Sequence, residues 1–394
     1  MGILQQQYKS EAQAELHQIL QFWANHAVDN INGGFYGQIN ENNEVSSIAP
    51  KGSVLNSRIL WTFSAAYNQT HHLEYLELAE RAYDYLTAHF IDKKYGGLYW
   101  TVDYLGNPLD TKKQIYATAF AIYALSEYHK INKLKEAKIG AMQLFQDIEK
   151  HSFESKHTGY IDAFTRDWNE IHDMRLSEKD SNEKKTMNTH LHILEAYTNL
   201  YGIWQDNTLK EKIIFLIKDF TDHIINSLNH HLILFFDEYW NPKSTIISFG
   251  HDIEASWLLQ EAAEAIKDKV IIDQIKQLSL QITDAVIDGV DEDGGLWNEK
   301  EGNSFMKEKH WWPQAEAMVG FLNAFQNSGN EKYFRLSYRS WQFIRQYIKS
   351  PDGEWYWGIK VDHTIMKGQD KAGLWKCPYH NSRACLEIMK RIKD

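Results

Sequence analysis

Gly96-Gly97-Leu98-Tyr99-Trp100 is one copy of a glycine–aromatic signal that recurs along the chain and decides its fold. The other copies are Gly33-Gly34-Phe35-Tyr36, Gly159-Tyr160, Gly294-Gly295-Leu296-Trp297 and Gly353-Glu354-Trp355-Tyr356-Trp357, and the first glycines of successive copies lie 63, 63, 135 and 59 residues apart. The interval of 135 residues is about two periods, and the strand-like segment from His231 to Asp237 occupies the place of the missing copy. A fixed period of this kind is typical of a repeat architecture, so we expect six units.

Between these signals, apolar residues recur at spacings of three and four, which predicts two helices per unit. The expected helices span residues 10–29, 53–70, 72–91, 114–130, 133–151, 187–204, 208–228, 251–267, 269–288, 312–327, 330–349 and 378–392. Twelve antiparallel helices in six hairpins can close into an all-α (α/α)6 barrel, with short β-ribbons at its mouth. The six prolines are scattered and no flexible linker divides the chain, so residues 1–394 are expected to form one catalytic domain.

The composition argues against several classes of protein. Lys plus Arg total 42 against 53 Asp plus Glu, and no long basic tract offers a footprint for phosphates, so no nucleic-acid partner is expected. The chain has neither a long apolar run nor a secretory signal pattern, which predicts no membrane partner. Cys377 and Cys385 suggest neither a disulfide framework nor a zinc site, so we expect a cytoplasmic protein; its oligomeric state is left open.

Closure of such a barrel would place all inner-helix N-termini, and the ribbons, at one end. Polar residues at these helix starts should then converge on one pocket, where helix dipoles favour an oxyanion. The residues at these starts are Arg58, Tyr116, Asn188 with His192, His251 with Glu254, Trp312 with Glu316, and Trp375 with His380. Because they recur with the period of the fold, we interpret them as one site.

The histidines allow more than one interpretation. His251 and Glu254 lie three residues apart and share a helix face, so the carboxylate can orient the imidazole or bind a sugar hydroxyl; alternatively, His251 only packs at a helix start. His190 and His192 point to nearly opposite sides of a helix. We assign His192 to the pocket and His190 to a structural role, although the two roles might be exchanged.

The remaining candidates also have structural alternatives. Arg58 can hold an enediolate oxygen or form a salt bridge, Tyr116 can donate a hydrogen bond or pack, and Trp312 can be a sugar platform or a core residue. His251 and His380 approach from different helices, which suits a two-base proton exchange. No His-Glu-x-x-His, Gly-x-Gly-x-x-Gly or P-loop string occurs, so neither a metal nor a nucleotide cofactor is predicted.

Four strings resemble the N-acylglucosamine 2-epimerase superfamily, and most closely its members that act on cellobiose. These strings are Lys185-Thr186-Met187-Asn188-Thr189-His190-Leu191-His192-Ile193-Leu194-Glu195-Ala196-Tyr197, Phe249-Gly250-His251-Asp252-Ile253-Glu254-Ala255-Ser256-Trp257, Trp311-Trp312-Pro313-Gln314-Ala315-Glu316-Ala317 and Trp375-Lys376-Cys377-Pro378-Tyr379-His380-Asn381. The resemblance extends from about residue 10 to residue 392. It implies a cofactor-free enzyme that converts the reducing-end glucose of a β-1,4-linked disaccharide to mannose, as in cellobiose to glucosylmannose or lactose to epilactose.

The resemblance also implies roles for the candidate residues. His380 and His251 would be the acid/base pair, and Arg58 and His192 would support the enediolate and ring opening. The sugar would be bound by Tyr116, Asn188, Glu254, Trp312, Glu316 and Trp375, and Asp180 would reach the site from a charged loop.

The implied reaction is ring opening, removal of the C2 proton, rotation about C2–C3 and reprotonation on the other face. Return of the proton at C1 would give a ketose instead, so a mannose isomerase is an alternative within the superfamily, as is an N-acylglucosamine 2-epimerase. Two further alternatives are a glycoside hydrolase that uses Glu254 and Glu316, and a sugar-binding protein without catalysis.

Overall fold

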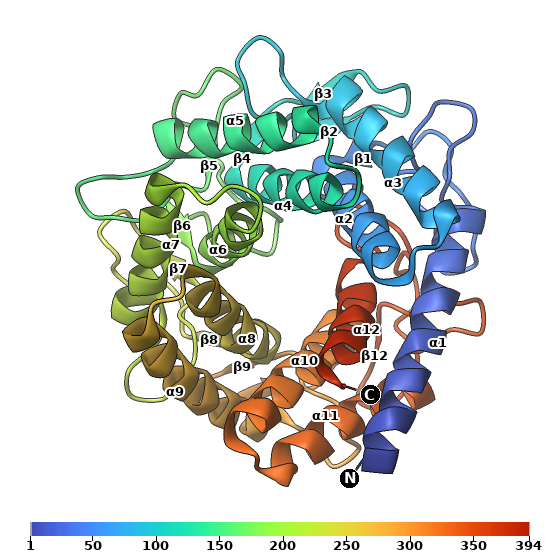
Figure 1. Cartoon of the computed structure of the whole chain (residues 1–394), viewed down its shortest axis with the longest axis vertical. Coiled ribbons are helices and arrows are strands. Elements are labelled where there is room, and N and C mark those ends of the chain that lie inside the picture. Colours follow the sequence, from blue (N-terminus) through green and yellow to red (C-terminus); the bar gives the residue numbers. More distant parts are fainter. Residues whose placement is uncertain (1, 394) are drawn as a thin grey trace.

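The computed structural model describes residues 2–393 and consists of two concentric rings of helices (Figure 1). The outer ring contains α1 (Gly2–His26), α3 (Leu73–Tyr85), α5 (Lys135–His151), α7 (Asn207–Asp219), α9 (Lys269–Val286) and α11 (Glu331–Phe343). The inner ring contains α2 (Ser53–Thr70), α4 (Ile115–Asn132), α6 (Met187–Tyr201), α8 (Phe249–Ile266), α10 (Trp311–Ser328) and α12 (Tyr379–Arg391). Successive inner helices pack together, α12 returns to α2, and α1 packs on α12. The (α/α)6 barrel predicted from the repeat is confirmed.

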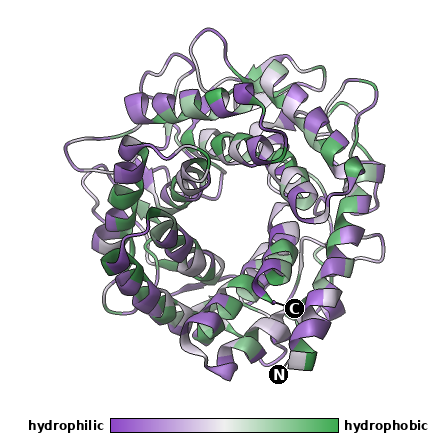
Figure 2. Ribbon diagram, viewed as in Figure 1, coloured by the Kyte–Doolittle hydropathy of each residue, from purple (hydrophilic) through white to green (hydrophobic). Residues whose placement is uncertain are grey.

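The two rings differ in how their side chains are buried. Every residue of α4 from Ile115 to Tyr128 is buried, as expected for a helix with neighbours on all sides. In α5 the buried residues form a single stripe: Ala137, Ala141, Leu144, Phe145 and Ile148. Figure 2 accordingly shows hydrophilic residues along the outer faces of the outer helices. None of the described helices is both long and apolar enough to cross a lipid bilayer.

Short antiparallel strands join neighbouring units at the end where the inner helices begin. The strands are β1 (Lys51–Gly52), β2 (Thr101–Val102), β3 (Pro108–Asp110), β4 (Lys113–Gln114), β5 (Ala163–Phe164), β6 (Lys185–Thr186), β7 (Phe235–Phe236), β8 (Ile246–Ser248), β9 (Glu299–Glu301), β10 (Ser304–Met306), β11 (Lys309–His310) and β12 (Gly358–Ile359). The strand before an inner helix pairs with the ribbon of the next unit, as in β1–β2, β4–β5 and β6–β7. β7 lies in the segment where the missing copy of the repeat was expected. The ribbons and the inner-helix starts therefore share one end, as predicted.

A buried ion pair fastens the starts of several inner helices to the preceding outer helices. A lysine two residues before the inner helix contacts an acidic residue that lies just after the preceding outer helix. The pairs are Lys51–Asp29 at 2.8 Å, Lys113–Asp92 at 3.0 Å, Lys185–Glu154 at 3.8 Å and Lys309–Asp291 at 2.7 Å. In the fourth unit, Ile247 and Asn226 occupy these two places. There His231 binds Asp252 of α8 at 2.7 Å, so a different buried pair fastens this helix.

The glycine–aromatic signals have a steric cause. Gly97 has a φ of +62°, and a Cβ there would lie 2.8 Å from the ring of Trp168, in the ribbon of the next unit. Gly159 faces Trp240 in the same way, at 2.4 Å. These tryptophans also stack on His151 and His223, at centroid distances of 4.3 and 4.8 Å. Glycine is required because an aromatic ring of the neighbouring unit lies directly on the backbone.

The structure corrects two helix boundaries and adds a detail. The first helix begins at Gly2 and not near residue 10, because Tyr8 anchors this polar stretch to α11, with 3.1 Å between its hydroxyl and Ser337 Oγ. The helix expected over 208–228 ends earlier as a regular α-helix. It closes, like two other outer helices, in a π-helical turn; these turns are η1 (Leu86–Phe90), η2 (Phe220–Ile224) and η4 (Ile344–Ile348), and α9 closes in a 3₁₀ turn, η3 (Ile287–Gly289).

Candidate active site

Equivalent positions of the inner helices form a buried layer near the mouth of the barrel. The sixth residues of α2, α4, α6, α8 and α10 are Arg58, Phe120, His192, Glu254 and Glu316. All five are buried. The Arg58 guanidinium lies 4.1 Å from the centroid of the Phe120 ring, which lies 4.6 Å from the ring of His192. The repeat therefore brings together side chains that are about one unit apart in sequence.

The two histidines predicted to exchange a proton lie against the same tryptophan. The rings of His251 and His380 both contact Trp312, at centroid distances of 4.7 and 5.6 Å. His251 Nδ1 lies 2.8 Å from Ser248 Oγ, and His380 Nδ1 lies 2.7 Å from Glu316 Oε1. Within residues 2–393, neither Nε2 atom has a hydrogen-bonding partner, so both are available to a substrate.

Burial keeps both of these histidines neutral. It lowers the pKa of His251 to about 3, with a smaller contribution from His192, and it lowers the pKa of His380 well below its usual value, together with the charges of Arg58 and Arg383. A neutral imidazole is a base, so each of these histidines can accept a proton at neutral pH.

A buried arginine, which the sequence analysis did not select, connects three carboxylates beneath the histidines. Arg383 Nη2 donates to Glu254 at 2.5 Å and to Glu316 at 2.7 Å, and its Nη1 donates to Glu195. Burial and the Glu316 charge raise the pKa of Glu254 to about 7. At Glu195 burial acts in the same direction, but Arg383 and His192 outweigh it and lower the pKa to about 2. One arginine thus holds carboxyl groups of very different acidity.

Arg58 and Tyr116 form the opposite wall of the site. Arg58 Nη2 donates to the hydroxyl of Tyr116 at 2.8 Å, and its guanidinium also lies over the ring of Tyr379. The Tyr116 ring contacts His192 at 5.0 Å and Trp375 at 6.1 Å. Tyr116 therefore links three other predicted site residues, which are Arg58, His192 and the half-buried Trp375.

The geometry separates His190 from His192. His190 Nδ1 lies 2.7 Å from the carbonyl oxygen of Thr186, and its Nε2 accepts from the backbone N–H of Tyr160 at 2.9 Å. Both ring nitrogens are therefore bonded to the backbone, as expected for a structural residue. His192 instead lies in the layer with Arg58.

Asn188 and Asp180 are placed differently. Asn188 lies in the first turn of α6, and its Oδ1 is buried without a hydrogen-bonding partner in the described chain. An unpaired buried acceptor of this kind suits a substrate hydroxyl. Asp180 Oδ2 accepts from the backbone N–H and the hydroxyl of Ser177, both at 2.9 Å. No hydrogen bond or ion pair within residues 2–393 joins Asp180 to the other site residues.

The residues missed from the sequence follow one spacing. Glu195 lies three residues after His192, and Arg383 lies three residues after His380, as Glu254 does after His251. Residues three apart share a helix face, so each histidine has a charged residue one turn deeper in the barrel. This shared spacing is the signal that could have identified Glu195 and Arg383.

The cluster of Glu254, Glu316 and His380 has donor atoms within 4.8 Å of one another, as a metal site would. The carboxylates, however, already share the Arg383 guanidinium, which supplies a positive charge at hydrogen-bonding distance. The donor set therefore fits an internal cation better than a metal ion.

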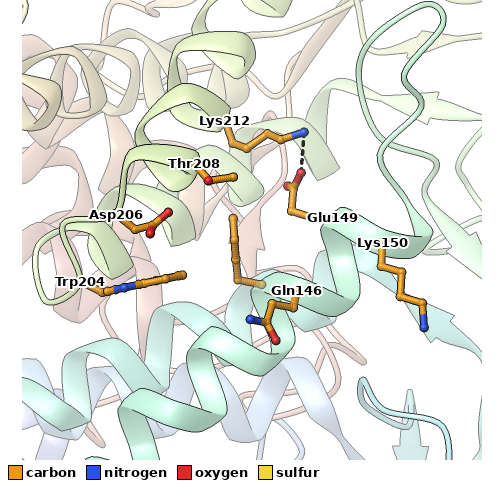
Figure 3. Close-up of a pocket in the computed structure, with 8 residues that line it drawn as sticks. Gln146, Glu149, Lys150, Trp204, Asp206, Thr208 and Lys212 are labelled. Atoms are coloured by element: carbon orange, nitrogen blue, oxygen red, sulfur yellow. Dashed lines mark ion pairs between the residues drawn. The ribbon is translucent and has the colours of Figure 1, made fainter.

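A depression of about 530 Å³ lies on the outer wall of the barrel between α5 and α7, away from these residues (Figure 3). Its lining residues are Phe145, Gln146, Glu149, Lys150, Trp204, Asp206, Thr208 and Lys212. Lys212 Nζ lies 2.7 Å from Glu149, whose other oxygen accepts from the hydroxyls of Tyr160 and Tyr197. These polar groups are already paired, and the groove lies outside the inner ring, so we do not assign it to the site.

Fold and site together define an (α/α)6-barrel protein with a buried cluster of histidines, carboxylates and arginines near the N-terminal ends of its inner helices. The family model for N-acylglucosamine 2-epimerase (GlcNAc 2-epimerase) matches residues 33–384, and the chain belongs to this family. It is an isomerase of the epimerase type, and the resemblance seen in the sequence is confirmed.

Several relatives are similar over their full length. The chain is 49% identical over 385 residues to a cellobiose 2-epimerase of Bacteroides fragilis, with 97% of this chain and 98% of the relative covered. It is 41% identical to a cellobiose 2-epimerase of Ruminococcus albus, with 98% and 99% covered. The solved cellobiose 2-epimerase of Bacillus thermoamylovorans is 40% identical, with a TM-score of 0.94 and 98% and 100% of the two chains covered.

Proposed function

We propose that this isomerase epimerises C2 of the reducing-end glucose of β-1,4-linked disaccharides, such as cellobiose to glucosylmannose and lactose to epilactose. The observation that carries the proposal is that His251 and His380, from different helices, flank one indole and both present an unpaired Nε2. The full-length similarity to cellobiose 2-epimerases supports the disaccharide as substrate. We further propose that the helices of the closed ring form one catalytic domain.

The reaction begins with opening of the sugar ring, because the C2 proton becomes acidic only beside a carbonyl. We assign this step to His192. One of His251 and His380 then removes the C2 proton, and Arg58 stabilises the enediolate through its fixed positive charge. After rotation about C2–C3, the other imidazole protonates the opposite face of C2.

The returning histidine must enter this step protonated. Glu254 can hold such a proton near neutral pH, because its pKa is raised to about 7, and its Oε1 lies 4.0 Å from His380 Nδ1. Its transfer to His380, whose own pKa is held well below the usual value by burial, requires the negative charge of the enediolate, which favours the imidazolium. Burial and the Glu316 charge cause this raised pKa. The proton taken up by the first histidine returns to the network after the product leaves.

The remaining residues bind the substrate. Trp312 and Trp375 offer aromatic faces to the apolar C–H face of a pyranose, and Tyr116, Asn188, Glu254 and Glu316 offer polar groups to its hydroxyls. We keep Asp180 as a candidate that contacts substrate from its loop. No step in this scheme requires a metal or a nucleotide cofactor.

The carboxylates do not have the arrangement that an inverting glycoside hydrolase uses. Such enzymes hold their two carboxyl groups ~6.5–9.5 Å apart to admit a water molecule. Glu254 Oε1 and Glu316 Oε1 both bind the same Arg383 nitrogen, at 2.5 and 2.7 Å, which keeps them much closer together. This geometry argues against an inverting glycoside hydrolase.

The test is incubation with cellobiose, lactose, mannose and N-acetylglucosamine in heavy water, followed by product chromatography. We expect an intact disaccharide with mannose at its reducing end and deuterium at C2, and loss of both in His251→Asn and His380→Asn. Ketose formation from mannose without disaccharide turnover would instead indicate a mannose isomerase. Release of monosaccharides would indicate hydrolysis. Conversion of N-acetylglucosamine alone, with no turnover of the other sugars, would indicate an N-acylglucosamine 2-epimerase.

A further inference from the structure

The hydrogen bonds of Glu195 leave one arrangement of protons on His192. Glu195 Oε2 lies 2.8 Å from His192 Nδ1, and both side chains are almost completely buried. The other oxygen, Oε1, accepts from Arg383 Nη1 and from the hydroxyl of Tyr379. Because an ionised carboxylate can only accept hydrogen bonds, Nδ1 of His192 must carry the proton. In the neutral imidazole, Nε2 then has a free lone pair.

We propose that Glu195 is a positioning residue that fixes the Nδ1-protonated tautomer of His192 and stabilises its imidazolium during ring opening. The proposal rests on the proposed function, in which His192 opens the sugar. His192 Nε2 accepts the proton of the C1 hydroxyl while the C1–O5 bond breaks and C1=O forms. The imidazolium then returns this proton to O5, so the histidine is regenerated.

The surroundings of His192 support this role. Its ring faces Tyr116 and Phe120, at centroid distances of 5.0 and 4.6 Å, and neither ring supplies a charge. Glu195 is therefore the anion that directly contacts the imidazole. Arg383 and Tyr379 fix the carboxylate from its other side, so it cannot rotate away without losing both donors. Carboxylates that orient a histidine in this way commonly control its tautomer as well as its position.

Glu195→Gln tests the proposal because an amide cannot accept on both sides. The Gln oxygen is expected to face Arg383 and Tyr379, whose groups only donate there, and its NH₂ then faces His192 Nδ1. That nitrogen must become an acceptor, so the proton moves to Nε2. We expect kcat to fall on the order of 10³-fold with little change in KM, since the wrong tautomer impairs chemistry more than binding.

The readout that separates positioning from a merely structural role is the ¹⁵N NMR spectrum of histidine-labelled protein, with the His192 signals assigned by their loss in His192→Gln. Wild type should show Nδ1–H and Glu195→Gln should show Nε2–H. The matched control is Glu149→Gln, which removes a half-buried carboxylate of the outer ring that accepts from two tyrosine hydroxyls. It should leave the His192 signals and kcat unchanged.

Two results would overturn the proposal. One is an Nε2–H tautomer in the wild type, which needs no variant and so remains decisive if Glu195→Gln does not fold. The other is a folded Glu195→Gln with Nδ1–H and near wild-type kcat. If the tautomers behave as expected but the wild type epimerises no sugar, the positioning by Glu195 stands and the proposed function fails.

Discussion

Asp162 links the stability of the barrel to pH in a way that can be calculated. Its side chain is buried beneath the start of α6, where Oδ1 accepts from the Thr186 backbone N–H at 3.1 Å. Oδ2 accepts from the hydroxyls of Thr186 at 2.6 Å and Thr189 at 2.9 Å. These bonds favour the charged form, but burial outweighs them and raises the pKa of Asp162 to about 7. The group therefore keeps its proton in the folded protein at a pH where an unfolded aspartate has lost it.

Proton linkage determines whether the free energy of unfolding rises or falls with pH. Because the folded pKa is raised, the stabilising contribution of Asp162 is complete below the unfolded pKa of ~3.9 and is lost as the pH rises toward the folded pKa of about 7. With these two values, the free energy of unfolding falls by about 3 kcal/mol between about pH 5 and about pH 8 through this group alone. Asp162→Asn keeps most of the hydrogen bonds but cannot titrate.

The assay is urea unfolding of wild type and Asp162→Asn, followed by tryptophan fluorescence at several pH values in that range. The difference between the two free energies of unfolding cancels the contributions of all other groups. We expect it to shift in favour of Asp162→Asn by about 3 kcal/mol as the pH rises from about 5 to about 8. A difference that stays constant with pH would refute the argument, because Asp162 would then be charged in both states.

Two further perturbations test the glycine signal and the buried carboxyl network. Gly97→Ala should lower the free energy of unfolding by more than Gly302→Ala, because both glycines have positive φ (+62° and +56°) but of these two only Gly97 faces a ring. We expect a loss of ~1–2 kcal/mol from the backbone conformation at either position and a larger loss at Gly97. Equal losses would contradict the steric argument. Because burial and Glu316 raise the pKa of Glu254 to about 7 and its proton is needed, kcat/KM should fall as the pH rises through that value. Glu254→Gln should have lower activity without this alkaline limb, and a pH–rate profile with the limb intact would show that another group causes it.

The sequence predicted the fold well because the repeat is carried by steric requirements. Glycines under aromatic rings, such as Gly97 under Trp168 and Gly159 under Trp240, recur in several units and mark their ribbons. The second helix was expected over 53–70 and α2 has these bounds. The start of α1 was missed because Gly2 to Lys9 is polar and its burial depends on Tyr8, whose partner Ser337 lies on a distant helix.

Most of the candidate site could be predicted from the sequence, but Glu195 and Arg383 were missed. Arg58, His192 and Glu254 lie at the starts of inner helices, so their order along the chain follows the fold's own period. Glu195 lies one turn deeper than His192, and Arg383 follows His380 by three residues near the start of α12. Both helices are buried on most sides, so the hydrophobic pattern does not distinguish the face toward the axis. The assignment of His192 over His190 rested on a shared face with Asn188, which agrees with the contacts of both histidines.

The packing of α1 against α12 sets the order in which the enzyme can be completed during synthesis. In the order of synthesis α1 precedes α12 and all the helices between them, so the face of α1 that packs on α12 stays uncovered until α12 has been made. Until then, the nascent chain is an open arc with apolar surface at both ends. Because His380 is carried by α12, it reaches Trp312 and the proposed partner His251 only when this arc closes, so a chain that lacks α12 lacks half of the proposed acid–base pair.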